Sequence, residues 1–168
     1  MAKIGVFYGS TTGHTQEVVE NVVSKLNDAG LEVDIFDVSK ASKDDLVKYE
    51  NLILASSTYG DGDLQTDWED FANNLCEDSF ENKVVAIIGL GDQDSYSDTF
   101  CDAIGILANL AKKATLVGKT KNSGYEFESS KSLEGDEFLG LVIDEDNQSD
   151  LTEERIANWV NEVKDKFK

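Results

Sequence analysis

The stretch that decides how this chain folds is Val6-Phe7-Tyr8-Gly9-Ser10-Thr11-Thr12-Gly13-His14-Thr15. An apolar run ends there in a glycine and four hydroxyl side chains, and a helical pattern begins immediately afterwards. Backbone N–H groups and hydroxyls converge at a helix N-terminus of this kind, and the helix dipole favours negative charge. We therefore predict that a strand, a hydroxyl-lined loop and a helix together form an anion site.

The same loop is suited to one terminal phosphate, bound mostly by neutral donors. It is not a Walker A loop, since no G-x-x-x-x-G-K-[ST] pattern can be read through it and His14 follows its glycine. It also lacks the G-x-G-x-x-G pattern of dinucleotide-binding turns. An ordinary strand-to-helix turn with a cluster of capping residues is the alternative interpretation.

Length and composition favour a single domain. A chain of 168 residues can bury a real core, and we expect one domain over residues 1–168. The sequence has no apolar run of transmembrane length, no basic leader and no lipidation signal, so we expect a soluble cytoplasmic protein. Cys76 and Cys101 form no C-x-x-C pair and are expected to be buried free thiols. A single histidine argues against a histidine-based metal site, and we expect no metal.

The chain is strongly acidic. It has 15 basic and 34 acidic residues and a net charge of -19. Nucleic acid and anionic membranes are therefore poor partners. Residues 49–110 contain 13 acidic side chains and one basic side chain, Lys83. A solubilising surface would explain the total charge, but it explains this uneven distribution less well.

Hydrophobic periodicity predicts strands that alternate with helices. Strands are expected at residues 3–8, 31–38, 51–55, 83–88 and, in two parts, 115–117 and 138–143. Helices are expected from the hydroxyl loop to Gly30, at 42–48, around 68–75, at 100–110 and at 151–167, the last with Lys164, Lys166 and Lys168 in its final turn. This alternation indicates a parallel sheet covered by helices on both faces. Residues 118–137 are long for a loop, and Tyr125, Phe127 and Leu133 favour an ordered conformation.

Three loops are expected at the carboxyl ends of the strands, where open parallel sheets bind ligands. They are residues 9–15, residues 56–63 and residues 89–96. The second and third loops each combine glycines, an aromatic side chain and carboxylates, which suit a flat ring with polar edges. A phosphate at the first loop and a planar heterocycle between the other two describe a mononucleotide.

With these motifs, nearly the whole chain resembles the flavodoxins. The chain matches the family signature from Val6 to Thr15. It departs from the signature at Val19, where alanine is usual. Residues 63–68, 89–93 and 144–148 are also similar to family segments. The resemblance implies an open, doubly wound, five-stranded parallel sheet of order 2-1-3-4-5, with FMN at the switch point. Residues 118–137 resemble the loop that interrupts the fifth strand of long-chain members.

The resemblance also implies a set of cofactor-binding residues. Tyr96 would stack on the outer face of the flavin, while Tyr59 would either stack on the inner face or turn outward. A weaker inference places Asp146 at the phosphoribityl side. The phosphate would be held by Ser10, Thr11, Thr12, Gly13, His14 and Thr15, the pyrimidine edge approached by Leu90, Gly91 and Asp92, and the other side lined by Thr58, Gly60 and Gly62.

The function implied by the resemblance is that of a low-potential one-electron carrier and not of an enzyme. Non-covalently bound FMN would shuttle between semiquinone and hydroquinone, and the peptide after Gly60 would turn toward the flavin when N5 gains a proton. Expected partners of this monomer are redox proteins with basic docking patches, by family analogy a flavodoxin reductase or a low-potential oxoacid oxidoreductase.

Two other classes remain open on the sequence alone. A flavodoxin-like NAD(P)H-dependent quinone reductase or nitroreductase needs room beside the flavin for a hydride donor, and the acidic loops would repel a pyridine nucleotide phosphate. A flavin-free response regulator needs an acidic pair after the first strand, where this chain has hydroxyl groups.

Overall fold

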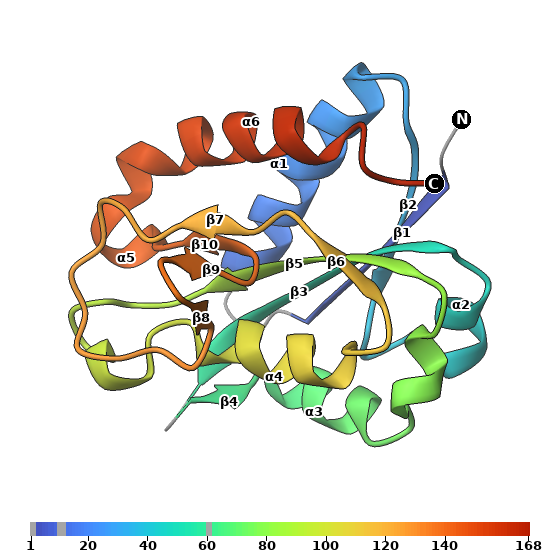
Figure 1. Ribbon diagram of the computed structural model, residues 1–168, viewed down its shortest axis with the longest axis horizontal. Helices are drawn as coiled ribbons and strands as arrows, with labels where there is room; N and C mark the ends of the chain where they lie inside the picture. Colours follow the sequence, from blue (N-terminus) through green and yellow to red (C-terminus); the bar gives the residue numbers. More distant parts are fainter. Residues whose placement is uncertain (1–2, 10–12, 60–61) are drawn as a thin grey trace.

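The central sheet carries all the main strands in parallel. The computed structural model describes residues 3–9, 13–59 and 62–168. Its strands are β1 (Lys3–Gly9), β2 (Glu32–Asp37), β3 (Asn51–Tyr59), β5 (Val84–Leu90) and β10 (Leu141–Ile143), hydrogen-bonded in the order β10-β5-β3-β1-β2 (Figure 1). Counted as main strands, this is the expected order 2-1-3-4-5, so the predicted fold class is confirmed.

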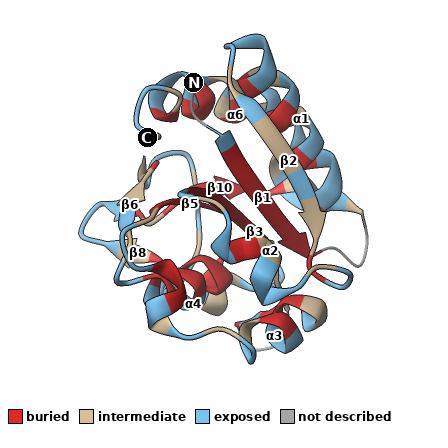
Figure 2. Cartoon of the chain, turned by 90° about the vertical axis from the view of Figure 1, so that its right-hand side faces the viewer, coloured by how far each residue is buried: buried red, intermediate tan, exposed pale blue. Residues whose placement is uncertain are grey.

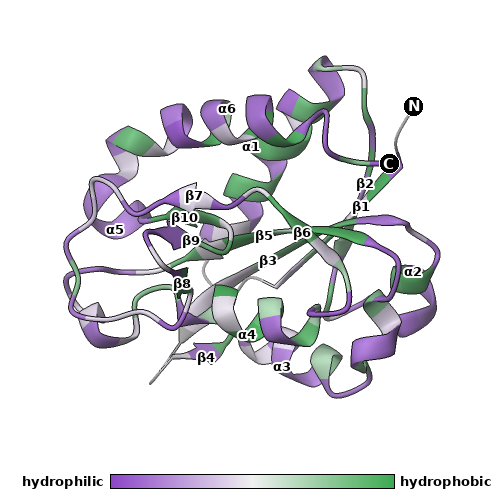
Figure 3. Cartoon of the chain, in the orientation of Figure 1, coloured by the Kyte–Doolittle hydropathy of each residue, from purple (hydrophilic) through white to green (hydrophobic). Residues whose placement is uncertain are grey.

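Two layers of helices cover this sheet because each face is apolar. One face packs against α1 (His14–Asp28) and α6 (Thr152–Val163), and the other against α2 (Lys43–Val47), α3 (Thr66–Ala72) and α4 (Asp102–Leu110). Figure 2 shows buried strands between these layers, and Figure 3 shows polar residues on the outward sides of the helices. Every residue of β5 is buried, as expected for the centre of a parallel sheet. None of the helices in the described part of the chain is long and apolar enough to cross a membrane.

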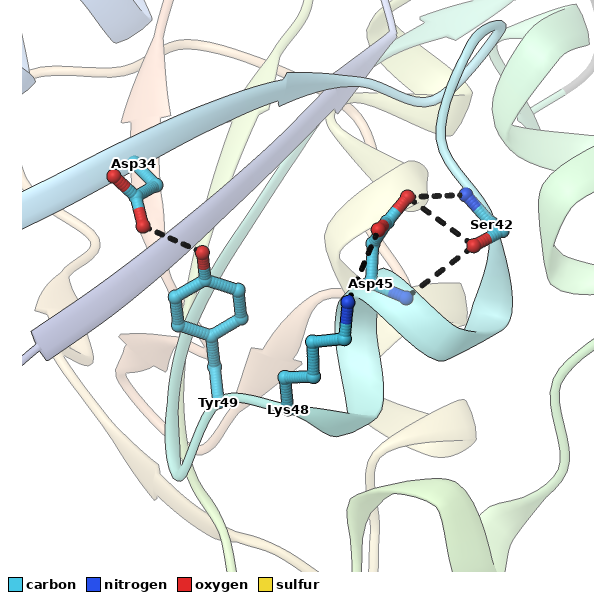
Figure 4. A network of polar contacts seen from close by, with 5 residues as sticks. All are labelled: Asp34, Ser42, Asp45, Lys48 and Tyr49. Carbon is cyan, nitrogen blue, oxygen red and sulfur yellow. Dashed lines mark hydrogen bonds and ion pairs between the residues drawn. The ribbon is translucent and has the colours of Figure 1, made fainter.

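The helix α2 is short and owes its start to a capping box. Asp45 N donates to Ser42 Oγ, and Ser42 N donates to Asp45 Oδ2 at 2.9 Å (Figure 4). Just beyond the helix, Tyr49 Oη donates to Asp34 Oδ2 on β2 at 2.5 Å. Burial, followed by this hydrogen bond, raises the pKa of Tyr49 well above its usual range. These contacts fix the connection from β2 to β3.

The second predicted loop is largely a hairpin. The structure extends β3 through Ser56 to Tyr59, whereas the sequence predicts a strand that ends at Ala55. The chain then returns as β4 (Asp63–Leu64), which pairs with β3 in antiparallel fashion. Small and polar residues in this stretch obscure the strand in the sequence, and the hairpin partner supplies the hydrogen bonds that sustain it.

The edge of the sheet beyond β5 consists of two short strands that both pair with β5. β6 (Thr115–Val117) pairs with the first half of β5, and β10 pairs with its second half. Between them, β7 (Thr120–Lys121), β8 (Leu133–Glu134) and β9 (Glu137–Phe138) form a separate three-stranded sheet. Residues 138–143 are therefore not one strand, because Gly140 separates them and its backbone lies against Ile87, leaving no room for a side chain. Tyr125 and Phe127 pack on Phe100 and Phe138. These contacts agree with the ordered conformation that the sequence predicts for residues 118–137.

Two other local predictions are wrong. The helix α6 ends at Val163, so the lysines at 164, 166 and 168 lie beyond it. The chain end is instead held by Asn51, whose Oδ1 accepts from Lys168 N at 2.8 Å. Cys101 is buried, but Cys76 is exposed, since it lies outside α3 and precedes a 3₁₀ helix, η1 (Glu77–Phe80). The remaining short elements are η2 (Ser97–Thr99), α5 (Glu145–Gln148) and η3 (Ser149–Leu151).

Candidate functional site

The loops at the carboxyl ends of β1, β3, β5 and β10 surround one pocket of about 190 Å³. Seven of the residues predicted from the sequence line it: His14, Thr58, Leu90, Gly91, Asp92, Tyr96 and Asp146. Ser57 and Glu145 also line it and are absent from the sequence prediction. The sequence could have indicated them only through their position next to a predicted residue, Thr58 or Asp146. Ser10, Thr11, Thr12 and Gly60 lie outside the described residues, as does the side chain of Tyr59.

The first wall of the pocket is the N-terminus of α1. Gly13 is its N-cap residue and has a φ of 91°, a left-handed conformation that glycine adopts without strain. His14 begins the helix and lines the pocket. Thr15 is buried, and its Oγ1 lies 3.2 Å from Ser57 Oγ at the end of β3. The N–H groups of the first helical turn and two coupled hydroxyls therefore stand together, as a phosphate site requires.

The second wall is the hairpin of β3 and β4. Thr58 Oγ1 accepts a hydrogen bond from Ala103 N at 3.1 Å, which ties the hairpin to α4. Ser56 Oγ accepts from Gln65 N at 3.1 Å, and Trp68 Nε1 donates to Ala55 O at 2.7 Å. Gly62 has a φ of 96° and lies beside Asp102. The hairpin is thus anchored to two helices behind the pocket.

The third wall is the loop after β5, which is folded around Asp92. Its Oδ1 accepts from Asp94 N at 3.0 Å, from Ser95 N at 2.9 Å and from Asn147 Nδ2 at 2.8 Å. Burial tends to raise the pKa of Asp92, but these hydrogen bonds outweigh it, and the pKa lies below its usual value. Asp92 is therefore ionised at neutral pH and serves the loop as a fixed acceptor.

Two neighbours of Asp92 shape the open side of the pocket. Tyr96 N donates to Asp92 O at 2.9 Å, and the Tyr96 side chain is 49% exposed at the pocket wall. A Cβ on Gly91 would lie 2.7 Å from Cys101 Sγ and 3.0 Å from Cys101 N. Glycine is required there because the backbone packs directly on Cys101. This requirement does not depend on a ligand in the pocket. An exposed aromatic ring beside bare backbone can cover a flat ligand.

The fourth wall depends on a buried carboxylate that the sequence prediction missed. Asp144 is fully buried and caps α5 by accepting from Asn147 N at 3.0 Å. Its Oδ2 also accepts from Gln93 N at 3.1 Å and Gln93 Nε2 at 2.6 Å. Gln93 Oε1 in turn accepts from Glu126 N at 2.7 Å. Asp144 therefore joins the third loop, α5 and the segment 118–137. Its sequence signals are its place in the family-like segment 144–148 and an aspartate directly before a short helix, and neither indicates a buried contact with Gln93.

Charge within the pocket is mainly negative. Burial, then the nearby charge of Asp92, raises the pKa of Asp146, while His14 acts in the opposite direction. His14 and Asp146 thus interact across the pocket. Helix N–H groups and hydroxyls stand on one side, and carboxylates that can accept from hydroxyl groups stand on the other. This arrangement of donors and acceptors fits a ligand with a phosphate, a hydroxylated chain and a flat polar-edged ring.

A doubly wound parallel sheet with such a pocket at the carboxyl ends of its strands defines a mononucleotide-binding α/β protein. The flavodoxin family model matches residues 6–159. The flavodoxin of Helicobacter pylori is 46% identical over 99% of both chains, and flavodoxin 1 of Escherichia coli is 42% identical over 99% of this chain and 96% of that one. The crystal structure of Fusobacterium nucleatum flavodoxin bound to flavin mononucleotide superposes with a TM-score of 0.93, at 34% identity and full coverage of both chains. The chain belongs to the flavodoxin family.

Proposed function

We propose that this protein is a one-electron carrier that binds FMN non-covalently in the pocket at the carboxyl ends of its strands. The observation that carries the proposal is the meeting of the α1 N-terminus, the hairpin, the Asp92 loop and α5 around one pocket in a chain that matches the flavodoxin family over residues 6–159. Flavodoxins are electron-transfer proteins and not enzymes. No feature of the described residues favours the quinone reductase alternative.

The phosphate side of the site is assigned to the first loop. The α1 N-terminus supplies N–H donors, and the paired hydroxyls of Thr15 and Ser57 supply further donors beside them. His14 at the start of the helix adds one more donor. The full set proposed for the phosphate is Ser10, Thr11, Thr12, Gly13, His14 and Thr15, of which the first three come from the family resemblance alone.

The ring side of the site is assigned to the other loops. FMN supplies the redox chemistry, and the protein binds it and tunes its potentials. Tyr96 covers one face of the ring, and the backbone at Leu90 and Gly91, with the fixed acceptor Asp92, borders one edge. The hairpin residues Thr58, Tyr59, Gly60 and Gly62 border the opposite side, and Asp146 faces the hydroxylated chain.

The partners proposed for this carrier are redox proteins with basic docking patches. A net charge of -19 and the acidic residues of 49–110 support this choice. Asp63 on β4, Asp94 on the Asp92 loop and Asp98 on η2 are exposed, and each lies within a few residues of one that lines the pocket. By family analogy the partners are a flavodoxin reductase and a low-potential oxoacid oxidoreductase. We further propose a cytoplasmic monomer.

Identification of the bound cofactor tests the function directly. Purified protein should be yellow, and heat extraction should release one FMN per chain. Release of mainly FAD, or of no flavin, would contradict the proposal. Addition of NADPH alone should leave the flavin oxidised, whereas rapid bleaching would support a reductase.

A matched pair of ligands tests the phosphate assignment. Thr15→Ala should weaken FMN by about 1–2 kcal/mol through the loss of a charge-assisted hydrogen bond and leave riboflavin, which has no phosphate, nearly unaffected. Affinities can be measured by quenching of flavin fluorescence. Equal losses for both ligands would show that Thr15 acts only through packing.

A further inference from the structure

A second cavity, of about 340 Å³, lies between α6, β7 and β9 (Figure 1). Among the described residues it shares no lining residue with the pocket assigned to FMN. Its volume falls within the range of roughly 300–1,000 Å³ that small organic ligands occupy in proteins. The function proposed above gives this cavity no role.

The inner wall of this cavity is apolar and firmly held. Leu141 is 2% exposed and Trp159 is 1% exposed, and both line the cavity. The polar atoms of its aromatic residues are already used, since Trp159 Nε1 donates to Gly118 O at 2.8 Å and Tyr125 Oη donates to Val142 O at 2.7 Å. These contacts leave hydrocarbon and ring surface to face a ligand.

Arg155, the only arginine of the chain, also lines the cavity. Its guanidinium carbon lies 4.1 Å from the centre of the Tyr125 ring, and this stacking holds the charged group in place. Within the described part of the chain its buried Nη1 has no hydrogen-bond partner, and its side chain makes no ion pair. A buried donor without an acceptor costs free energy, so an acceptor is missing here.

The other charged residues that line the cavity are each matched by an opposite charge. The matches are the ion pairs Lys119–Glu134 at 3.0 Å and Lys166–Glu162 at 3.6 Å, and the cross-strand pair Lys121–Glu137 of β7 and β9. Arg155 therefore keeps an uncompensated positive charge at the cavity, although the chain as a whole carries a net charge of -19.

We propose that this cavity binds a small organic monocarboxylate, whose carboxylate pairs with Arg155 and whose apolar body lies against Trp159 and Leu141. The planar guanidinium offers N–H donors in a geometry that matches the two oxygens of a carboxylate. The apolar wall favours a ligand with a hydrocarbon or aromatic body over a bare inorganic anion. Glu137 and Glu162 also line the cavity and repel a second negative charge, so a dicarboxylate fits less well.

Benzoate is a suitable probe, because it combines one carboxylate with a flat apolar ring. In N–H correlation NMR spectra of the full-length, FMN-loaded protein, the indole signal of Trp159 reports on the cavity and should shift in a saturable way as benzoate is added. Benzamide keeps the shape without the charge, and acetate keeps the charge without the ring. Each should bind at least about tenfold more weakly than benzoate. Phthalate, which adds a second carboxylate, should also bind more weakly.

A pair of variants tests the role of Arg155. Arg155→Met removes the charge, keeps an apolar side chain and should weaken benzoate by at least about tenfold. Lys121→Met removes one positive charge from the same cavity, at a residue that faces Glu137 across the strands. It is the matched control and should keep the wild-type affinity within about threefold.

Equal affinities of the wild type for benzoate and benzamide would overturn the proposal, and this comparison needs no variant. The absence of a saturable shift, or shifts confined to residues that line the FMN pocket, would do the same. An equal loss in Lys121→Met and Arg155→Met would show general attraction of an anion to positive charge and would also contradict a site built on Arg155.

Discussion

At the scale of single residues, one aromatic residue of the site faces solvent and is well placed to cover a ligand. Tyr96 is 49% exposed, although a large aromatic side chain without a partner is normally buried more completely. Its backbone is fixed by the bond from its N–H to Asp92 O. The exposure therefore belongs to a positioned residue and not to a loose loop.

We expect Tyr96→Ala to loosen FMN and to raise the potential of the second one-electron reduction. The aromatic face disfavours an electron-rich reduced ring, and the side chain also excludes water from it. The potential can be measured by spectroelectrochemical titration, with Tyr96→Phe as the matched control that keeps the ring. If affinity and potential are unchanged in Tyr96→Ala, the side chain does not contact the flavin.

At the scale of elements, the site is held by a few buried polar contacts that cross from one loop to another. Asp144 is the clearest case, since it joins the Asp92 loop, α5 and the segment 118–137 through Gln93 and Asn147. The hairpin depends in the same way on Thr58 and α4. Loops built like this keep their shape without the ligand, which lowers the entropic cost of binding.

We expect Asp144→Ala to lower the free energy of unfolding by about 3 kcal/mol, because it leaves two buried donors of Gln93 without their acceptor and removes the cap of α5. Asp144→Asn, which keeps one acceptor oxygen, should cost less. Urea unfolding of the flavin-free protein measures both. Asp136→Ala, at an exposed position in the same half of the chain, serves as control and should change stability by less than about 0.5 kcal/mol. An equally small effect of Asp144→Ala would show that these contacts are not structural.

At the scale of the whole molecule, the uneven charge has consequences at the flavin site. A single carboxylate about 10 Å away repels a unit charge in water by roughly 0.4 kcal/mol. Several such groups together disfavour a reduced, negatively charged cofactor. The same field extends into solvent by about 10 Å at ordinary ionic strength and can guide a basic partner to the pocket.

We expect the triple variant Asp63→Asn, Asp94→Asn, Asp98→Asn to slow electron transfer to a basic redox partner at low ionic strength and to flatten its salt dependence. Long-range attraction raises association rates by roughly 10- to 1000-fold and is screened by salt. Stopped-flow kinetics over a range of salt concentrations provides the measurement. Asp61 belongs to the same acidic group in the sequence but lies outside the described residues.

The matched control replaces three other exposed aspartates with asparagine: Asp28, Asp44 and Asp165. They lie elsewhere in the chain and make no ion pair in its described part. Both variants change the net charge by the same amount. If they slow transfer equally, only the total charge matters, and the acidic surface beside the pocket does not guide the partner.

Much of the site could be predicted because its signals are local. The apolar run before Gly9, the hydroxyl loop and the helical spacing after it predict a strand, a loop and a helix, whatever the rest of the chain does. The content of residues 89–96 likewise places Gly91, Asp92 and Tyr96 together, and the structure brings them to one pocket. Resemblance to the flavodoxins added the strand order, which periodicity alone does not contain.

The sequence by itself thus determined the alternating α/β pattern, the side of the sheet where the site lies and the acidic character of the molecule. Tertiary structure alone decided that β3 continues into a hairpin, that Gly140 divides the last strand and that α6 stops at Val163. It also decided that Asp144 joins three segments and that Asp102 is buried under the hairpin. These features depend on contacts between residues far apart in the chain, and no local pattern of residues encodes which distant partner supplies a hydrogen bond or removes water.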